Sequence, residues 1–177
     1  HKEYRRQRQM CIRDRLVSED PKTLKPVPGV AERWEISEDG LVYTFHFRKN
    51  AKWSNGDPVT ANDFVYSYRR ILNPNLASQY ASMLHGLKNA RRYHREGTSW
   101  EEANVGVVAI DEHTLQLTLE NPTPYFLELL NHYSWFPAHP PTIEKFDAFA
   151  KQGTSWTRPG NYVCLLYTSD AADDTPC

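Results

Sequence analysis

The side chains with the clearest potential for chemistry are the seven histidines of this 177-residue chain. A zinc site needs His, Cys or carboxylate ligands at a defined spacing, such as two histidines four residues apart on one helix. No two histidines have that spacing: His46 falls in a run of alternating residues, and the others are scattered. The sequence therefore predicts no metal site.

Motifs for nucleophilic catalysis and phosphate binding are also missing. The sequence has no Gly-x-Ser-x-Gly elbow and no glycine-rich phosphate loop. Asp39, Asp57, Asp63 and Asp111 stand in contexts typical of turns and a helix cap, where a short carboxylate binds backbone N–H groups. None of them pairs with another acid as a general acid and base would. We therefore expect no catalytic residue, no enzymatic activity and no cofactor.

Composition and charge exclude several classes of partner. The chain has 21 Lys and Arg against 22 Asp and Glu, a net charge of −1. It lacks the basic surplus of a nucleic-acid-binding protein, so we expect no nucleic-acid partner. No apolar run approaches the roughly 20 residues of a membrane-spanning helix. The basic cluster at residues 91–95 is interpreted as the solvated face of a helix.

The two ends of the chain differ from the rest and are related to each other. Residues 1–15 are strongly basic, whereas residues 164–177 are acidic and rich in small side chains. Residues 1–14 can be back-translated into a DNA sequence whose reverse complement is also a coding sequence. Read one frame over, that reverse complement encodes residues 164–177, residue for residue. Such an inverted repeat is typical of a sequencing-library adaptor. We predict that both ends are adaptor-derived and that residues 16–163 carry the natural protein.

The alternative for the ends is a genuine basic arm with an acidic tail, which would bind nucleic acid or a membrane surface. It leaves the complementarity of the two ends unexplained. All three cysteines, Cys11, Cys164 and Cys177, lie in these ends. Residues 16–163 therefore have no thiol chemistry, no disulfide and no cysteine-based metal site.

The most informative stretch, residues 41–72, predicts a strand, a tight turn and a capped helix. Apolar residues occupy every second position at 41–47, which is the period of a strand with one buried face. Residues 54–57 contain Asn-Gly, and both residues tolerate the positive φ of a turn. Thr60 then caps a helix, and Asp63 stands where a capping box places its acid.

The flanking sequence predicts further short strands and helices. Residues 34–36 form a hairpin with the first strand through Asp39-Gly40, and residues 105–110 and 114–119 form a second hairpin. Helices are expected at residues 77–87, within 88–103 ahead of a loop, from Thr123-Pro124 onward with Thr123 as N-cap, and at 142–151. The fold class is therefore α+β, with short antiparallel strands and about four helices.

Residue identities add a resemblance that periodicity alone does not carry. The matching segments are Tyr43-Thr44-Phe45, Phe47-Arg48, residues 51–54, 58–61, 63–67 and 107–115, Pro122-x-Pro124-Tyr125-Phe126, and Pro159-Gly160-Asn161. These segments resemble the extracytoplasmic solute-binding proteins, family 5, of ABC importers, which capture peptides and nickel. The residue identities at positions 66–70 and 77–82 are more similar to the oligopeptide branch of the family than to the nickel branch.

The resemblance implies both a fold and a function. The fold would be a fragment of a two-lobed periplasmic-binding-protein (type II) fold, with residues 16–163 supplying mostly the small middle domain and its borders. The protein would capture short peptides outside the cytoplasmic membrane and deliver them to the ABC permease subunits. It would be a monomer, periplasmic or an extracytoplasmic lipoprotein, with a signal peptide missing from this chain.

The resemblance also implies site residues. In the family, a tyrosine of the Ala-Ser-x-Tyr-Ala-Ser segment lines the peptide cleft, and Tyr80 matches it; a core tyrosine at helical spacing is the alternative. Gly160 and Asn161 match a crossing between lobes, so a hinge is implied there, although a turn explains both residues equally well. Trp53 is predicted to pack where strand meets turn. Residues that grip the peptide termini would lie outside this chain.

Three other functions stay open. The protein could be a nickel- or other-solute-binding member of the same family. A peptidase would need a nucleophile or metal motif in a part outside this chain, and product formation would reveal it. A peptide sensor would bind peptides but lack a neighbouring permease gene.

Overall fold

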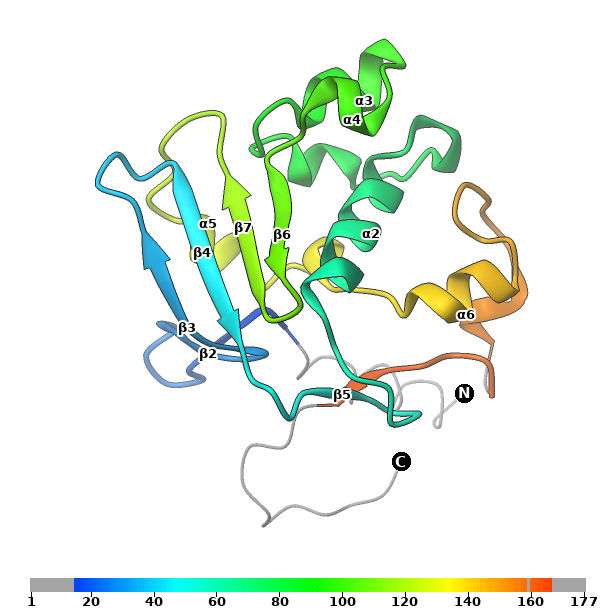
Figure 1. Cartoon of the computed structure of the whole chain (residues 1–177), viewed down its shortest axis with the longest axis horizontal. Helices are drawn as coiled ribbons and strands as arrows, with labels where there is room; N and C mark the ends of the chain where they lie inside the picture. Colours follow the sequence, from blue (N-terminus) through cyan, green and yellow to red (C-terminus); the bar gives the residue numbers. More distant parts are fainter. Residues whose placement is uncertain (1–14, 159, 167–177) are drawn as a thin grey trace.

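The computed structural model describes residues 15–158 and 160–166. A four-stranded antiparallel sheet lies beside a group of helices, and the longest of these, α2, packs against β6 and β7 (Figure 1). The strands lie in the order β3-β4-β7-β6. Their bounds are β3 Ala31–Ile36, β4 Val42–Phe47, β6 Val107–Asp111 and β7 Thr114–Thr118.

The burial pattern of β4 confirms the predicted alternation. Tyr43, Phe45 and Phe47 are buried, whereas the residues between them are half-buried. On β7, Leu117 lies opposite Tyr43 and Leu115 lies opposite Phe45, and both leucines are buried. The apolar face of the sheet therefore forms one wall of the core.

Both predicted hairpins are present. The turn between β3 and β4 contains Gly40 with a φ of 67°, a left-handed conformation that glycine adopts at little cost. The Asp39 carboxylate accepts a hydrogen bond from the Leu41 N–H in that turn. Between β6 and β7, the Asp111 carboxylate accepts one from the His113 N–H in the same way. These aspartates shape turns, as the sequence predicts.

Helix α2 (Ala61–Leu72) begins and ends where the sequence predicts. The Asp63 carboxylate accepts a hydrogen bond from the N–H of the N-cap, Thr60, at 3.0 Å, which belongs to the predicted capping box. The buried face of the helix includes Phe64, Tyr68 and Leu72. The Phe64 ring meets that of Phe47 edge-to-face, with 5.0 Å between centroids.

The predicted helix at residues 77–87 is wrong. One 3-10 turn, η3 (Ala81–Leu84), lies within this range, and another, η2 (Pro74–Leu76), ends just before it. Ala77 lies between them with a φ of 49°, which a continuous right-handed helix does not allow. The side-chain amide of Gln152 donates to two adjacent backbone carbonyls here, at 2.6 and 3.0 Å. A residue distant in sequence therefore stabilises the interruption.

The described residues contain five α-helices, against about four expected, and the α+β class is confirmed. Besides α2 they are α3 Ala90–Glu96, α4 Trp100–Ala103, α5 Phe126–Leu129 and α6 Pro140–Lys145. Helix α4 lies where the sequence predicts a loop. Its N-terminus is stabilised by a capping box between Ser99 and Glu102, which the sequence reading overlooked.

Helix α5 starts later than predicted. Its N-cap is Tyr125, and the predicted N-cap Thr123 uses its hydroxyl to donate to the Asn121 carbonyl at 3.1 Å instead. The Thr-Pro pair therefore belongs to the turn ahead of the helix.

Helix α6 is shifted toward the N-terminus relative to the predicted residues 142–151. It begins at Pro140, because proline is well accepted in the first turn of a helix. It ends at Lys145, and Asp147 adopts a φ of 49°, which directs the chain out of the helix.

Two small sheets flank the main one. They pair β1 (Val17–Glu19) with β2 (Pro26–Pro28), and β5 (Lys52–Trp53) with β8 (Leu165–Leu166). The Ser54 N–H donates to the Cys164 carbonyl at 2.7 Å next to β8. These contacts include residues from the predicted adaptor, but they do not test where the natural sequence ends, so that boundary stays a prediction. Residues 1–14 and 167–177 of the predicted ends lie outside the described residues.

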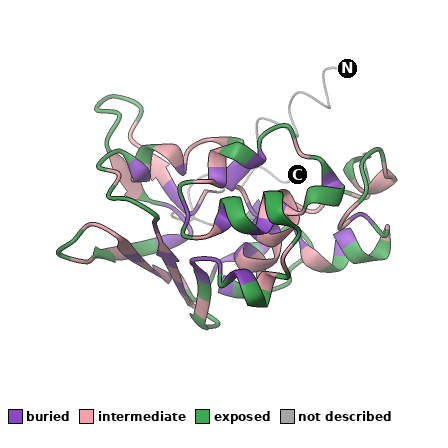
Figure 2. Ribbon diagram, turned by 90° about the horizontal axis from the view of Figure 1, so that it is seen from above, coloured by how far each residue is buried: buried purple, intermediate pink, exposed green. Residues whose placement is uncertain are grey.

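An edge-to-face series of aromatic rings joins the sheet to the helices through one core. Tyr43 contacts Phe126 at 4.8 Å between centroids, Phe126 contacts Trp135 at 5.5 Å, and Trp135 contacts Tyr68 at 5.4 Å. The Tyr68 hydroxyl donates to the Trp135 carbonyl, which satisfies its buried O–H. Figure 2 shows buried segments on both the strands and the helices. No helix in the described ranges is both long and apolar enough to cross a membrane.

Candidate functional site

Tyr80, which the resemblance assigns to peptide contact, lies on an exposed turn. It is the N-cap residue of η3, and 43% of its surface is exposed. Ala81 and Leu84 in the same turn are buried. The turn is thus anchored in the core while the Tyr80 side chain stays accessible. Tyr80 is therefore not a core residue, and its contact with peptide stays a prediction.

Two further rings lie against Tyr80. The Tyr133 ring meets it edge-to-face, with 5.0 Å between centroids and 78° between planes. The His132 ring lies 4.2 Å from Tyr133 and 5.7 Å from Tyr80. Tyr133 is itself 53% exposed. We call Tyr80, His132 and Tyr133 the aromatic corner.

The support of the aromatic corner is rigid. Tyr133 begins the turn η4 (Tyr133–Trp135), whose N-cap is His132. The Nδ1 atom of His132 lies 2.8 Å from the Ser134 hydroxyl and accepts a hydrogen bond from the Ser134 N–H. Trp135 is 1% exposed and belongs to the aromatic series of the core. The backbone below Tyr133 is therefore fixed from both sides.

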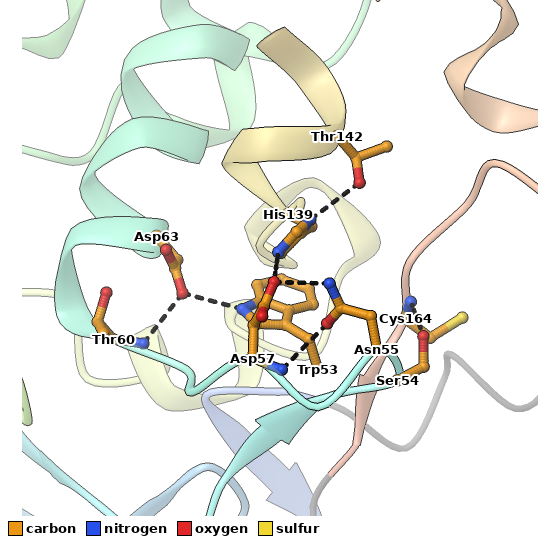
Figure 3. Close-up of polar contacts among 9 residues, drawn as sticks. All are labelled: Trp53, Ser54, Asn55, Asp57, Thr60, Asp63, His139, Thr142 and Cys164. Atoms are coloured by element: carbon orange, nitrogen blue, oxygen red, sulfur yellow. Dashed lines mark hydrogen bonds and ion pairs between the residues drawn. The ribbon is translucent and has the colours of Figure 1, made fainter. Parts of the chain in front are cut away.

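A network of polar contacts, which runs from exposed to buried side chains, lies at the turn after β5 (Figure 3). Trp53 Nε1 donates to Asp63 Oδ2 at 3.0 Å, and the same oxygen accepts from the Thr60 N–H. Burial raises the pKa of Asp63, while these two hydrogen bonds and the nearby His139 lower it in part. Trp53 is 2% exposed. It is a packing residue that also helps to hold the start of α2, as the sequence predicts.

His139 extends the network to α6. Its Nε2 lies 2.9 Å from Asp57 Oδ2, and its Nδ1 lies 2.8 Å from Thr142 Oγ1. With a proton on Nε2, the imidazole donates to the carboxylate and accepts from the hydroxyl, so both nitrogens are satisfied. The ring also packs edge-to-face on Trp53 at 5.2 Å. Figure 3 shows how His139 links the turn to the helix.

Thr142, His139 and Asp57 have the order hydroxyl, imidazole, carboxylate that hydrolase triads use. Thr142 is 8% exposed and His139 is 5% exposed. A nucleophile must reach a substrate carbonyl, and this hydroxyl is enclosed by the fold. The arrangement therefore joins two segments of the scaffold, the turn after β5 and the start of α6.

A shallow hollow of about 390 Å³ lies beside α3. Its lining is polar: His85, Gly86, Asn89, Arg91, Arg92, Glu96, Glu120, Asn121 and Thr123. The lining includes two arginines and two glutamates, so their formal charges balance. Arg91, Arg92 and Arg95 are exposed, which confirms the solvated helix face predicted at residues 91–95. Tyr80 does not line this hollow.

Two histidines of the described chain lie in contact beside this hollow. His85 Nε2 and His94 Nδ1 are 2.8 Å apart and share a hydrogen bond. Burial lowers the pKa of both rings, and the neighbouring arginines add to the effect, so the neutral forms are favoured. Across the described ranges, no three His, Cys, Asp or Glu side chains gather closely enough to hold a metal ion.

The predicted hinge residues lie in a turn near the end of the described chain. Gly160 has a φ of 85°, and a Cβ added there would meet open space. The Asn161 N–H donates to the Arg158 carbonyl, and its side-chain amide donates to the Ser155 carbonyl at 2.9 Å. The structure thus gives both residues a local role in the turn, and the hinge stays a prediction.

Comparison with known proteins assigns the chain to a family. Residues 25–165 match the model of the bacterial extracellular solute-binding proteins, family 5 Middle. The chain belongs to this family. The resemblance read from residues 41–72 and the later segments is therefore confirmed.

Proteins similar to this chain include periplasmic peptide-binding proteins. The chain is 48% identical over 143 residues to the periplasmic oligopeptide-binding protein OppA of Escherichia coli K12, covering 78% of this chain and 24% of that protein. It is 40% identical over 139 residues to the periplasmic murein peptide-binding protein MppA of the same strain, covering 77% and 24%. The chain spans about a quarter of the length of these relatives.

Solved structures agree with the fold. The crystal structure of Haemophilus influenzae OppA in complex with the peptide RPPGFSPFR is similar, with a TM-score of 0.75 and 40% identity, covering 85% of this chain and 28% of that one. The chain therefore has the fold of part of a type II periplasmic binding protein, as predicted.

Sequence reasoning singled out Tyr80 but not its ring neighbours His132 and Tyr133. The segment around them has no helical or strand period, and the sequence does not indicate that it meets η3. The only signal was the local density of aromatic residues between His132 and Phe136. Tyr80 and Tyr133 are far apart in sequence, so their contact becomes visible only in the folded structure.

Proposed function

We propose that this chain is part of a protein that captures short peptides outside the cytoplasmic membrane and delivers them to an ABC permease without turnover. The observation that carries the proposal is the accessible Tyr80 on an anchored turn. A binder of varied peptides needs aromatic surfaces and main-chain hydrogen bonds more than reactive groups. The OppA and MppA relatives are peptide-binding proteins by name, which supports a peptide as the ligand.

Calorimetry on the full-length protein tests the site. We expect Tyr80→Ala to weaken peptide binding by about fivefold to tenfold, because a ring contact contributes on the order of 1 kcal/mol. Tyr125→Ala is the matched control, since Tyr125 is also exposed, at 60%, and lies outside the aromatic corner. Equal affinities of the two variants for peptide would remove Tyr80 from the site.

Ligand class and turnover separate the remaining alternatives. Tight binding of nickel or another solute in place of peptide would move the protein to another branch of the family. Shortened peptides after incubation would indicate a peptidase. The enclosed Thr142 hydroxyl and the lack of a metal-ligand group among the described residues favour binding without reaction.

The cellular setting is part of the same proposal. The protein acts as a monomer in the periplasm, or as an extracytoplasmic lipoprotein, and docks on membrane permease subunits. The periplasmic relatives support this location. Permease genes next to the gene for this protein are expected, and a gene that stands apart from any permease would favour a peptide sensor.

We also propose that Gly160 and Asn161 form a hinge between the lobes. The left-handed φ of Gly160 restricts replacement, although space for a side chain is available. Gly160→Ala is expected to slow peptide association in stopped-flow measurements on the full-length protein, since lobe closure follows encounter. An unchanged association rate with lowered thermal stability would assign the pair to a turn alone.

A further inference from the structure

Tyr133 is an exposed aromatic residue that the fold holds in place. It is more than half exposed, so it contributes little to the core, yet its ring is fixed between those of Tyr80 and His132. We propose that Tyr133 and Tyr80 form a side-chain subsite that selects a peptide residue with an aromatic or long aliphatic side chain. This inference rests on the proposed capture of peptides.

The shape of the aromatic corner suits such a side chain. The two phenol rings stand at 78° to each other, so they form two walls rather than one flat surface. An apolar side chain placed against both walls removes its own apolar surface, and that of both tyrosine rings, from water, which favours binding. Aromatic guests add favourable edge-to-face or offset contacts with either ring.

Rigidity strengthens the argument. Leu84 anchors the turn that carries Tyr80, and Trp135 anchors the turn that carries Tyr133. His132 lies against the Tyr133 ring and is itself held by Ser134. A subsite already ordered before binding loses little conformational entropy when the ligand arrives.

The chemistry of Tyr80 and Tyr133 favours an uncharged guest. Neither phenol ring offers a charged group, so a charged peptide side chain placed against both would lose hydration without gaining an ionic partner from them.

Calorimetry on the full-length protein with the tripeptides Ala-X-Ala, where X is Phe, Leu, Asp or Lys, tests the subsite. Tyr133→Ala is expected to weaken binding of the Phe and Leu peptides by about fivefold to tenfold and to change binding of the Asp and Lys peptides less than about twofold. Tyr133→Phe keeps the ring and should retain the preference. Tyr125→Ala, an exposed tyrosine outside the corner, should leave all four affinities unchanged.

Three results would overturn the inference. An equal loss for all four peptides would mean that Tyr133 supports closure of the protein and selects no side chain. Unchanged affinities in Tyr133→Ala, together with weaker binding in Tyr80→Ala, would remove the subsite and leave peptide capture standing. A lack of peptide binding by the unmodified protein would overturn the proposed function itself.

Discussion

Residues with similar chemistry take different roles in this protein because of where the fold places them. Tyr80 and Tyr133 are accessible rings above buried neighbours, so they can meet a ligand. Trp53 and His139 are buried and satisfy polar groups of the scaffold. The sequence distinguishes Trp53 correctly through its place at the strand–turn junction. It does not reveal His139, whose partners Asp57 and Trp53 lie far away along the chain.

His139 is predicted to contribute strongly to stability. His139→Ala removes its hydrogen bonds with Asp57 and Thr142 and its packing on Trp53. We expect a loss of about 2–4 kcal/mol in the free energy of unfolding, measured by chemical denaturation. The control Asn55→Ala removes two exposed hydrogen bonds, one from its side-chain amide to the Asp57 carboxylate and one from the Asp57 N–H, and should cost less than about 1 kcal/mol. Comparable losses in both variants would contradict the role given to the imidazole.

Asp63 is predicted to make stability depend on pH. Burial is the largest influence on its carboxyl and raises the pKa in the folded state. Its contribution to stability is therefore present below the unfolded pKa and is lost as pH rises through the folded pKa. Asp63→Asn removes this titration, and one amide oxygen can still accept both bonds that Oδ2 accepts.

We expect Asp63→Asn to gain stability relative to the unmodified protein as pH rises from about 4 to 7. Unfolding free energies of both proteins, measured at several pH values across that window, provide the check. A relative loss of the variant with rising pH would show that the hydrogen bonds from Thr60 and Trp53 outweigh the cost of burial.

At the scale of elements, the position of η3 depends on how the segment after it meets the sheet. The Lys88 N–H donates to the Thr118 carbonyl, the Gly106 N–H donates to the Lys88 carbonyl, and the Thr118 N–H donates to the Gly106 carbonyl. Leu87 forms a bridge with Leu119 beside them. These bonds fix the chain that carries Tyr80 to the end of β7.

Gly106 is required at this contact. A Cβ on Gly106 would lie 2.4 Å from the Thr118 carbonyl oxygen and 2.9 Å from Lys88 Cβ. Gly106→Ala is therefore expected to lower the melting temperature, with a cost of about 1–3 kcal/mol. Gly86→Ala is the matched control, because a Cβ there meets nothing within 4 Å. Equal melting temperatures of the two variants would refute the close approach.

The interruption at Ala77 makes a second prediction for the elements. Its φ of 49° is unfavourable for alanine, so Ala77→Gly should leave stability unchanged or raise it by up to about 1 kcal/mol. Ala81→Gly, at a buried position of η3, should lower it. Denaturant unfolding of both variants gives the answer. A clear loss in Ala77→Gly would restore the continuous helix that the sequence predicts at residues 77–87.

At the scale of elements, the sequence predicts those features that neighbouring residues encode and fails where a distant residue decides the structure. Alternation in β4, the turn residues of both hairpins and the capping box of α2 are encoded by neighbouring residues, and all were predicted. Residues 77–87 have an apolar spacing that suits a helix, but Gln152 binds the carbonyls near Ala77. That contact depends on tertiary structure, so the local pattern misleads.

At the scale of the whole molecule, this chain spans about a quarter of the length of its relatives, and we propose that other parts of the peptide site lie outside it. The corner presented by η3 and η4 is one wall of the proposed peptide site. Resequencing the source gene outward from Leu16 and Val163 tests the predicted adaptor ends. Recovery of the same ends in an intact gene would make them part of the natural protein.

The central claim, that the protein captures peptides, is tested most directly by native mass spectrometry. The full-length protein would be purified without denaturation from cells grown in a peptide-rich medium, and the mass of the retained ligand would be measured. We predict a mixture of short peptides that dissociate intact. Retained nickel, a sugar or hydrolysed peptide fragments in place of intact peptides would contradict the claim.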